Sequence, residues 1–127
     1  RVLFRSFKGQ KVHPNNKSVF MSSNRLLQLL ELQESDPADA FVLFALAKEY
    51  EGLEDDSEAL HYYQQLLEKD PHYVGAFYHL AKLYERQEAL MEAISTYEKG
   101  IEVAKAAGDQ HALAELQSAK LNLELEL

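Results

Sequence analysis

Apolar positions in the middle of the chain follow the spacing of amphipathic helices, in which one face recurs every three, four and seven residues. The first set with this spacing consists of Leu43, Leu46, Ala47 and Tyr50. The second set consists of Ala59, Leu60, Tyr63, Leu66 and Leu67. Asp55 and Asp56 precede the second set and place negative charge at the positive end of a helix dipole. The pattern predicts two helices joined by a turn that begins at Gly52.

The same two-helix unit is written twice, with a period of 34 residues. Residues 36–69 and 70–103 align without a gap and agree at 12 of 34 positions. The apolar positions of the second copy are Phe77, Leu80, Ala81, Tyr84, Leu90, Ala93, Ile94, Tyr97 and Ile101. Each copy opens with an Asp-Pro pair, at Asp36-Pro37 and Asp70-Pro71, in which proline suits a first helical turn and aspartate suits its cap. A period of this length is typical of a repeat array, whose units bury their apolar faces against their neighbours.

Small and aromatic residues occupy matched positions on the inward faces of the two copies. The alanines are Ala47, Ala59, Ala81 and Ala93. The tyrosines are Tyr50, Tyr63, Tyr84 and Tyr97. Since a side chain larger than a methyl group would force crossing helices apart, the alanines predict close crossings, and the tyrosines fill the wider gaps.

Further helices are predicted on both sides of the doubled unit. Leucines between Leu26 and Leu32 form a broad apolar face, which predicts a helix over residues 23–35 that ends ahead of Pro37. After the second copy, Gly108-Asp109 combines a C′ glycine with a new N-cap, and a capping helix is predicted over residues 108–124. The repeat domain then covers residues 23–126, with about five or six helices.

The chain divides into a basic start and an acidic body. The first 20 residues carry five basic side chains and no acid, whereas residues 21–127 carry 8 basic and 21 acidic side chains, a net charge of −13. Gly9 and Pro14 break any helical pattern in the start, so we expect residues 1–22 to form a basic, disordered tail. A targeting or anion-binding arm is the alternative. The acidic body repels nucleic-acid phosphates and suits basic or neutral partners, so no nucleic acid is expected to bind.

Composition excludes several classes of protein. The chain has no cysteine, and therefore no disulfide framework, thiol nucleophile or thiolate metal site. No apolar run approaches the roughly 18 residues of a membrane span, and the start of the chain lacks the apolar core of a secretory signal. We therefore expect a cytoplasmic protein with no membrane partner.

These residues resemble the tetratricopeptide repeat (TPR) family, whose 34-residue helix-turn-helix unit has small and aromatic residues at set positions. The matching positions, in the first and second copies, are Leu43/Phe77, Leu46-Ala47/Leu80-Ala81, Tyr50/Tyr84, Ala59/Ala93, Tyr63/Tyr97 and Pro37/Pro71. The departures are Ala47 and Ala81 for the family's glycine, Leu66 and Gly100 where alanine is usual, and Lys105 for the closing proline. The resemblance implies a short, TPR-only, all-α protein whose antiparallel helix-turn-helix repeats stack in a right-handed superhelix.

The resemblance also implies where a partner would bind. In this family the first helices of the repeats line a concave surface that takes an extended peptide. The residues expected on that surface here are Phe41, Phe44, Lys48, Tyr78, His79, Lys82 and Arg86. Aromatic rings and lysines at matched positions offer stacking surface and charge to a peptide. The alternative is that the aromatic rings only pack against a neighbouring helix and that the lysines are solvated.

No catalytic or metal site is predicted. His72 and His79 lie seven residues apart, which is about 10 Å along a helix and too far for them to share a metal without other ligands. The run Glu54-Asp55-Asp56 lacks the alternation and the glycine of a calcium loop. The chain has no glycine-rich phosphate loop and no nucleophile elbow. We expect no enzyme activity, no cofactor and no metal.

The sequence favours a non-catalytic adaptor that binds a peptide or partner protein in the concave groove. One alternative is a homo-oligomerisation module that uses the leucine-rich terminal helices. A second alternative is an accessory subunit of a larger enzyme complex or RNA complex. Because stable arrays usually need about three repeats, we expect a monomer or a weak homodimer.

Overall fold

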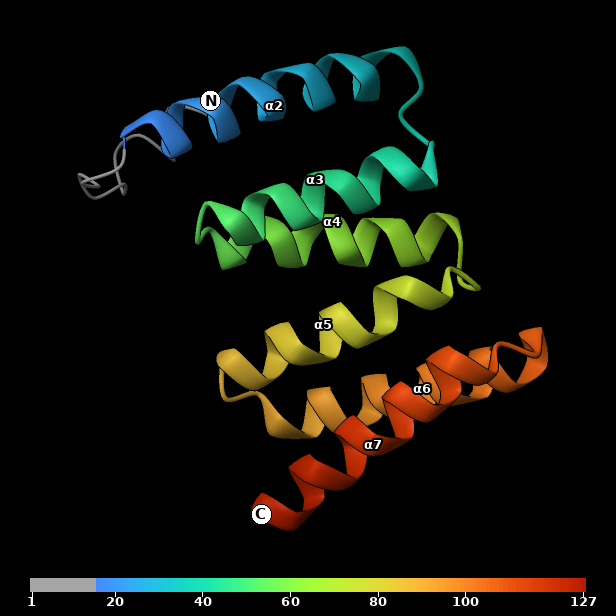
Figure 1. Cartoon of the computed structure of the whole chain (residues 1–127). Helices are drawn as coiled ribbons and strands as arrows, with labels where there is room; N and C mark the ends of the chain where they lie inside the picture. The colour runs from blue at the N-terminus through green and yellow to red at the C-terminus, as the bar shows by residue number, and fades with distance from the viewer. Residues whose placement is uncertain (1–15) are drawn as a thin grey trace. The chain divides into compact units, whose positions relative to one another are not determined.

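The computed structural model describes residues 16–127, which form helices joined by short turns (Figure 1). The helices in this range are α2 (Asn16–Ser35), α3 (Ala40–Gly52), α4 (Asp56–Lys69), α5 (Val74–Arg86), α6 (Leu90–Ala107) and α7 (Gln110–Glu126). The all-α fold of paired helices that the sequence predicts is confirmed. The chain divides within α4 into two compact units, the first ending at Tyr62 and the second beginning at Tyr63.

The helix expected over residues 23–35 is longer at its start. Helix α2 begins at Asn16, seven residues earlier than the sequence predicts. Residues 16–22, which we assigned to a disordered tail, are therefore helical. The remainder of that tail, residues 1–15, lies outside the described residues.

The first unit packs α2 against α3, and the first half of α4 completes its core. Its buried apolar side chains are Leu26, Val42, Leu43, Leu46, Ala47, Tyr50, Ala59 and Tyr62. The rings of Tyr50 and Tyr62 are stacked, with centroids 5.6 Å apart. An ion pair also joins α2 to α3, because Arg25 Nε donates to Oε1 of the buried Glu49 at 2.7 Å. A buried carboxylate without a cation would be costly, so this pair favours the docking of α2.

The second unit is built from α5, α6 and α7 with the end of α4. Helix α6 packs against both α5 and α7, and α5 also reaches α7. The buried side chains of this core are Phe77, Ala81, Ala93, Tyr97, Ala104, Leu116, Ala119 and Leu123. Helix α7 therefore contributes to the core of this unit.

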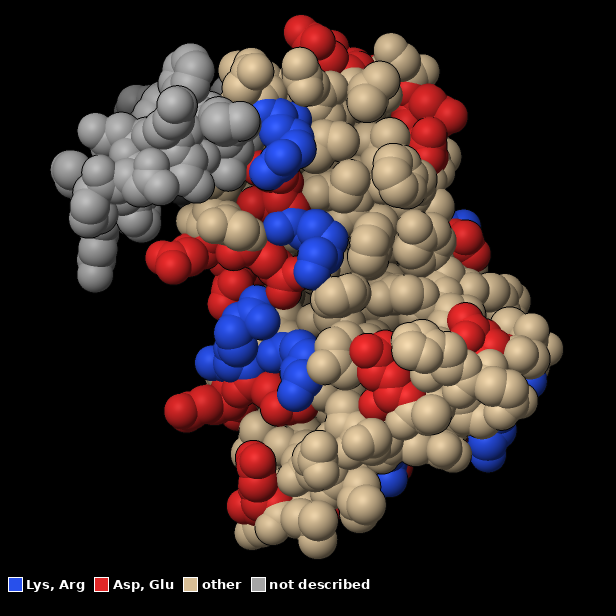
Figure 2. All heavy atoms as spheres, in the orientation of Figure 1, with Lys and Arg blue, Asp and Glu red and all other residues tan. Residues whose placement is uncertain are grey.

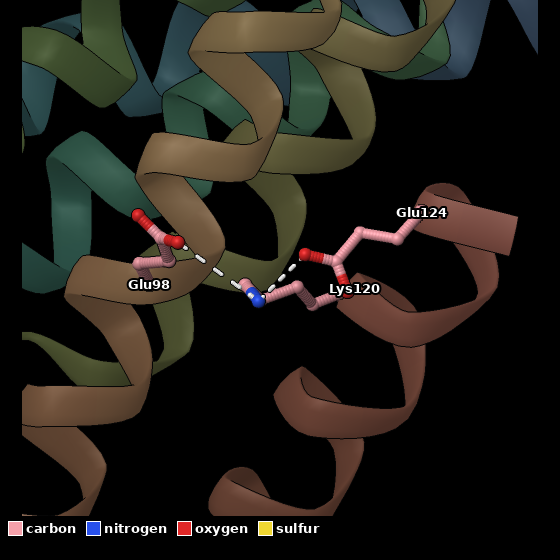
Figure 3. A network of polar contacts seen from close by, with 3 residues as sticks. All are labelled: Glu98, Lys120 and Glu124. Atoms are coloured by element: carbon pink, nitrogen blue, oxygen red, sulfur yellow. Dashed lines mark hydrogen bonds and ion pairs between the residues drawn. The ribbon is translucent and has the colours of Figure 1, made fainter. Parts of the chain in front are cut away.

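A polar contact at the surface joins α7 to α6 (Figure 3). Lys120 Nζ lies 2.8 Å from Glu124 Oε2 on its own helix and 3.9 Å from Glu98 Oε2 on α6. The hydrogen bond to Glu124 raises the pKa of Lys120, so the ammonium group stays charged between the two carboxylates.

The buried stripes predicted from the periodicity are confirmed at most positions. The predicted residues that are buried are Leu43, Leu46, Ala47, Tyr50, Ala59, Tyr63, Leu66, Phe77, Leu80, Ala81, Ala93 and Tyr97. The predicted residues that are only partly buried are Leu60, Leu67, Tyr84, Leu90, Ile94 and Ile101. The copies differ in burial at one tyrosine position. Tyr50 is fully buried, whereas Tyr84 is only partly buried, and its hydroxyl accepts a hydrogen bond from Gln64 Nε2 at 3.2 Å.

The Asp-Pro pairs lie in turns, and the prediction that they begin helices is wrong. The side chains of Asp36 and Asp70 each accept a hydrogen bond from the backbone N–H two residues ahead, at 3.4 and 3.2 Å. Helix α3 begins three residues after Pro37 and is capped by Asp39. Helix α5 begins three residues after Pro71, without a side-chain cap. Because each aspartate bonds within the turn, it is not available as a helix cap.

Three helices end in the same left-handed turn. Glu54, Glu88 and Gly108 have φ angles of 61°, 59° and 72°. In each turn the N–H of this residue donates to the carbonyl three residues back, and the next N–H donates to the carbonyl five residues before it. This is the Schellman motif, in which glycine is the usual left-handed residue. Gly108 confirms the predicted C′ glycine, but the glutamates carry a Cβ that this conformation disfavours.

We expect glycine at the two glutamate positions to stabilise the fold. Glu54→Gly and Glu88→Gly should each raise the free energy of unfolding by about 0.5–1 kcal/mol, because glycine adopts a left-handed conformation without strain. Denaturant unfolding of the single variants and the double variant measures this. The matched control is Glu102→Gly in α6, which removes the same side chain from an exposed helical position and should cost about 1 kcal/mol. A loss of stability in the first two variants would contradict the assigned strain.

Gly100 explains one departure from the family pattern. It is buried in α6, and a Cβ placed on it would lie 2.6 Å from Phe77 Cβ on α5 and 3.2 Å from Leu116 Cδ1 on α7. A methyl group does not fit there unless the helices move apart. The alanine that is usual at this position is therefore excluded by the packing of this chain.

Gly100→Ala should lower the stability, although alanine normally favours a helix. We expect a loss of about 1–3 kcal/mol from overpacking, measured by thermal and denaturant unfolding. The control is Gly75→Ala in α5, where the nearest atom to the added Cβ is 3.9 Å away. That variant should be neutral or slightly stabilising, since only helix propensity changes. Equal effects of the two substitutions would refute the close approach at Gly100.

Candidate functional site

The site residues predicted from the sequence lie on two helices, outside the fully buried stripes. We define the α3 face as Phe41, Phe44 and Lys48, and the α5 face as Tyr78, His79, Lys82 and Arg86. Members of each face are spaced three or four residues apart, with His79 beside Tyr78, so each set follows one side of its helix. The helices that the faces occupy are the first helices of the two repeats.

The α3 face combines exposed aromatic surface with a paired lysine. Phe41, near the start of α3, is 67% exposed, which is unusual for a large apolar side chain. Phe44 is half-buried one turn later. Lys48 Nζ lies 3.6 Å from Glu51 Oε1, and the lysine side chain is 43% exposed. The charge of this lysine is therefore partly balanced within its own helix.

The α5 face holds its lysine against an aromatic ring. Lys82 Nζ lies 5.8 Å from the centroid of the Tyr78 ring, within the range of a cation–π contact. The same nitrogen lies 3.8 Å from Glu85 Oε2, and the lysine side chain is 41% exposed. The Tyr78 ring is half-buried and also packs against the core of the second unit. Tyr78 therefore has both a packing role and an accessible position.

His79 is held between aromatic rings. Its imidazole is stacked on the Tyr63 ring of α4, with centroids 6.5 Å apart and planes 4° from parallel. It meets Tyr78 edge to face, at 5.6 Å between centroids. These contacts indicate a packing role for His79 beside its position on the α5 face. Arg86 is exposed in the last turn of α5, where the helix dipole favours a cation.

A buried tyrosine supports the α5 face, and the sequence reasoning did not assign it this role. The Tyr97 hydroxyl donates to Glu85 Oε2 at 2.5 Å. Burial raises the pKa of Tyr97, and the hydrogen bond and charge of Glu85 raise it further, so the hydroxyl keeps its proton. The available signal was the Lys-x-x-Glu spacing of both copies, which is followed in each by a tyrosine 12 residues after the glutamate.

Charges of both signs lie together on these surfaces. Figure 2 shows basic side chains next to acidic ones over α2 and α3, and again over the C-terminal part of α5. The Lys–Glu pairs of α3 and α5 agree with this arrangement. The faces therefore offer aromatic rings and locally balanced ion pairs, which are suited to non-covalent contacts.

The described residues offer little else to a ligand. Within that range, no three or more His, Asp and Glu side chains gather in a group that could hold a metal ion. None of the helices from α2 to α7 has both the length and the apolar character needed to cross a membrane.

Paired helices of this kind, with a repeated pattern of buried alanine and tyrosine, define a helical-repeat protein. Two family models described as tetratricopeptide repeat match residues 40–73 and 74–106. The chain therefore belongs to the tetratricopeptide repeat family. The two matches begin at the first residues of α3 and α5, and domains of this family are generally non-catalytic interaction modules.

Solved structures agree with this assignment. A tetratricopeptide repeat domain protein from Salinibacter ruber is 50% identical, with a TM-score of 0.67 over 70% of this chain and 90% of that one. A protein from Bordetella parapertussis is 31% identical, with a TM-score of 0.70 over 81% of this chain and 87% of that one. The TPR2B domain of yeast Sti1 is 17% identical, with a TM-score of 0.78 over 87% and 88%, and shows the fold alone. No curated protein matches the sequence significantly.

Proposed function

We propose that this chain is a non-catalytic interaction module that binds a partner protein or peptide through the α3 face and the α5 face. One observation carries the proposal. An aromatic residue and a partly exposed lysine recur at the same positions of both repeats, as Phe44 with Lys48 and Tyr78 with Lys82, outside the buried stripes. Both lysines lie outside the buried core and are partly exposed, so a peptide could use both their charge and the neighbouring ring.

The fold itself supports the proposal. The yeast Sti1 domain was solved as a complex with pHsp70, so a domain of the same fold holds a partner there. From that complex we take only that a domain of this fold can bind a partner. The chemistry of the partner has to be argued from the side chains of the α3 face and the α5 face.

Those side chains favour a partner that combines apolar groups with a local acidic group, although the net charge of −13 on residues 21–127 disfavours a partner that is acidic throughout. The exposed ring of Phe41 and the accessible part of Tyr78 offer apolar contact area. An acidic group of the partner would approach Lys48 or Lys82 from solvent and compete there with Glu51 or Glu85. Since exposed ion pairs contribute little, we expect charge to tune the affinity and the aromatic surface to supply most of it.

Reversing the two lysine charges tests the proposal. In the variant Lys48→Glu with Lys82→Glu, affinity for an acidic partner should fall about tenfold, because each new carboxylate repels the partner and also the neighbouring glutamate. The partner is first captured from the source cells with the wild-type chain, and its affinity is then measured by calorimetry. Circular dichroism checks that the helices are retained.

A charge-matched control is available in α6. The variant Lys99→Glu with Lys105→Glu changes the net charge by the same amount at exposed positions of α6 that belong to neither face. It should bind the partner as the wild type does. If the two double variants bind equally well, the α3 face and the α5 face are not the binding site.

Homo-oligomerisation is a second candidate function, favoured by the terminal helices. Of the seven large apolar side chains that are exposed in the described residues, four lie on α2 or α7, and a fifth directly follows α7. Those on α7 are Leu121 and Leu125, those on α2 are Leu27 and Leu32, and the one after α7 is its C-cap, Leu127. Exposed leucines gathered on two helices are more typical of a contact surface than of a solvated one.

Light scattering over a range of concentrations tests this second candidate. If the α7 leucines pair between copies, the mass should rise toward that of a dimer with concentration, and Leu121→Gln with Leu125→Gln should restore the monomer. Met91→Gln is the control, since Met91 is as exposed as Leu125, at 74% and 75%, but lies on α6. A monomeric mass at every concentration would exclude oligomerisation.

A further inference from the structure

A line of contacts runs from the core of the second unit to the α5 face. It begins at Tyr97, whose ring is fully buried in α6 and whose hydroxyl donates to Glu85 Oε2 at 2.5 Å. The same carboxylate oxygen lies 3.8 Å from Lys82 Nζ. That nitrogen lies 5.8 Å from the centroid of the Tyr78 ring. A buried hydroxyl is thus connected, through one carboxylate oxygen, to a lysine that solvent can reach.

We propose that Tyr97 is a positioning residue of the α5 face. Its hydroxyl holds the Glu85 carboxylate in one orientation, and that carboxylate holds the Lys82 ammonium beside the Tyr78 ring. The inference rests on the proposed function, because it assigns a purpose to the geometry of a face that contacts a partner. Tyr97 is fully buried, so no partner can contact it directly. The proposal adds it to the residues that determine binding.

The physical benefit is a lysine that is ordered before binding. A lysine side chain has several rotatable bonds and loses much of its freedom when a partner immobilises it. A lysine that is already held by a carboxylate and a ring loses less on binding, so the same contact contributes more to affinity. The tyrosine suits this role because its ring is fixed by the core, which leaves its hydroxyl little freedom to move away from Glu85.

The arrangement keeps its protonation state near neutral pH. Burial raises the pKa of Tyr97, and Glu85 adds to that effect, so the hydroxyl remains a donor. A donor that never ionises under these conditions cannot repel the carboxylate that it orients. The contact therefore acts as a fixed support.

The first test uses the 127-residue chain without a partner. Protons near the face of an aromatic ring are shifted upfield in NMR spectra, so the ε-methylene protons of Lys82 report the contact with Tyr78. Tyr78→Leu removes the ring and defines the unshifted value. In Tyr97→Phe, which removes only the hydroxyl, we expect the Lys82 shift to move most of the way to that value. A Lys82 shift that is unchanged in Tyr97→Phe would overturn the proposal, as would a Tyr78→Leu variant without any effect.

A matched control separates the loss of this hydroxyl from the loss of any buried hydroxyl. Tyr62 is also a buried tyrosine, and its hydroxyl donates to Gln33 Oε1 at 3.3 Å in the first unit. Tyr62→Phe should leave the Lys82 shift as it is in the wild type. If Tyr62→Phe moves the shift as much as Tyr97→Phe does, the effect is one of general stability and the positioning role is refuted.

A second variant keeps the proposal testable if Tyr97→Phe folds poorly. Glu85→Gln alters a side chain that is only partly buried and removes the charge that attracts Lys82. It should also move the Lys82 shift toward the Tyr78→Leu value, with the core intact. A Lys82 shift that survives Glu85→Gln would show that the carboxylate does not hold the ammonium group, and the proposal would fail.

A binding measurement distinguishes the inference from the proposed function. Affinity for the captured partner should fall about two- to tenfold in Tyr97→Phe and stay unchanged in Tyr62→Phe. If Tyr97→Phe abolishes the Lys82 shift but leaves the affinity unchanged, the α5 face does not contact the partner, and the proposed function fails at this face. If Lys82→Glu weakens binding while the Lys82 shift persists in Tyr97→Phe, the proposed function stands and the positioning role is wrong.

Discussion

The close approach of α5 and α6 at Gly100 is the constraint on which the second unit depends. Because Gly100 has a hydrogen atom in place of a side chain, the Phe77 side chain can lie against the backbone of α6. This brings the helices close enough for Tyr97 to reach across to Glu85, which is a contact between the same two helices. A small residue in the core and a supported lysine at the surface are therefore parts of one arrangement, because both need a short distance between α5 and α6.

The hydrophobic pattern predicted which residues are buried better than it predicted where helices begin. Leu43, Leu46 and Tyr50 are buried as expected, since burial follows from a spacing that the whole helix enforces. The start of a helix depends on one or two hydrogen bonds, and Asp36 had two possible uses, as a helix cap or within a turn. In the structure Asp36 bonds within the turn, and Asp39 caps α3. Likewise, only the folded backbone shows that Glu54, and not a glycine, takes the left-handed position.

The candidate site was predictable as positions but not as interactions. Spacing along α3 and α5 separates Lys48 and Lys82 from the buried stripe, because a helix has only one inward side. The partners of these lysines could not be assigned in the same way. Lys82 is placed by Tyr78 and Glu85 on its own helix, and through Glu85 by Tyr97 on the next. Contacts of the last kind depend on the distance between helices, which a linear pattern does not encode.

The division of the chain within α4 has a consequence for how the protein unfolds. The sequence repeats begin at residues 36 and 70, yet the two compact units meet at Tyr62 and Tyr63, in the middle of one continuous helix of 14 residues. Half of such a helix is far shorter than the roughly 12–15 residues at which an isolated helix becomes even marginally stable in water. Neither unit can then melt without shortening a helix that the other needs. The segment that recurs in the sequence, residues 36–69, is therefore not the segment that packs as one compact unit.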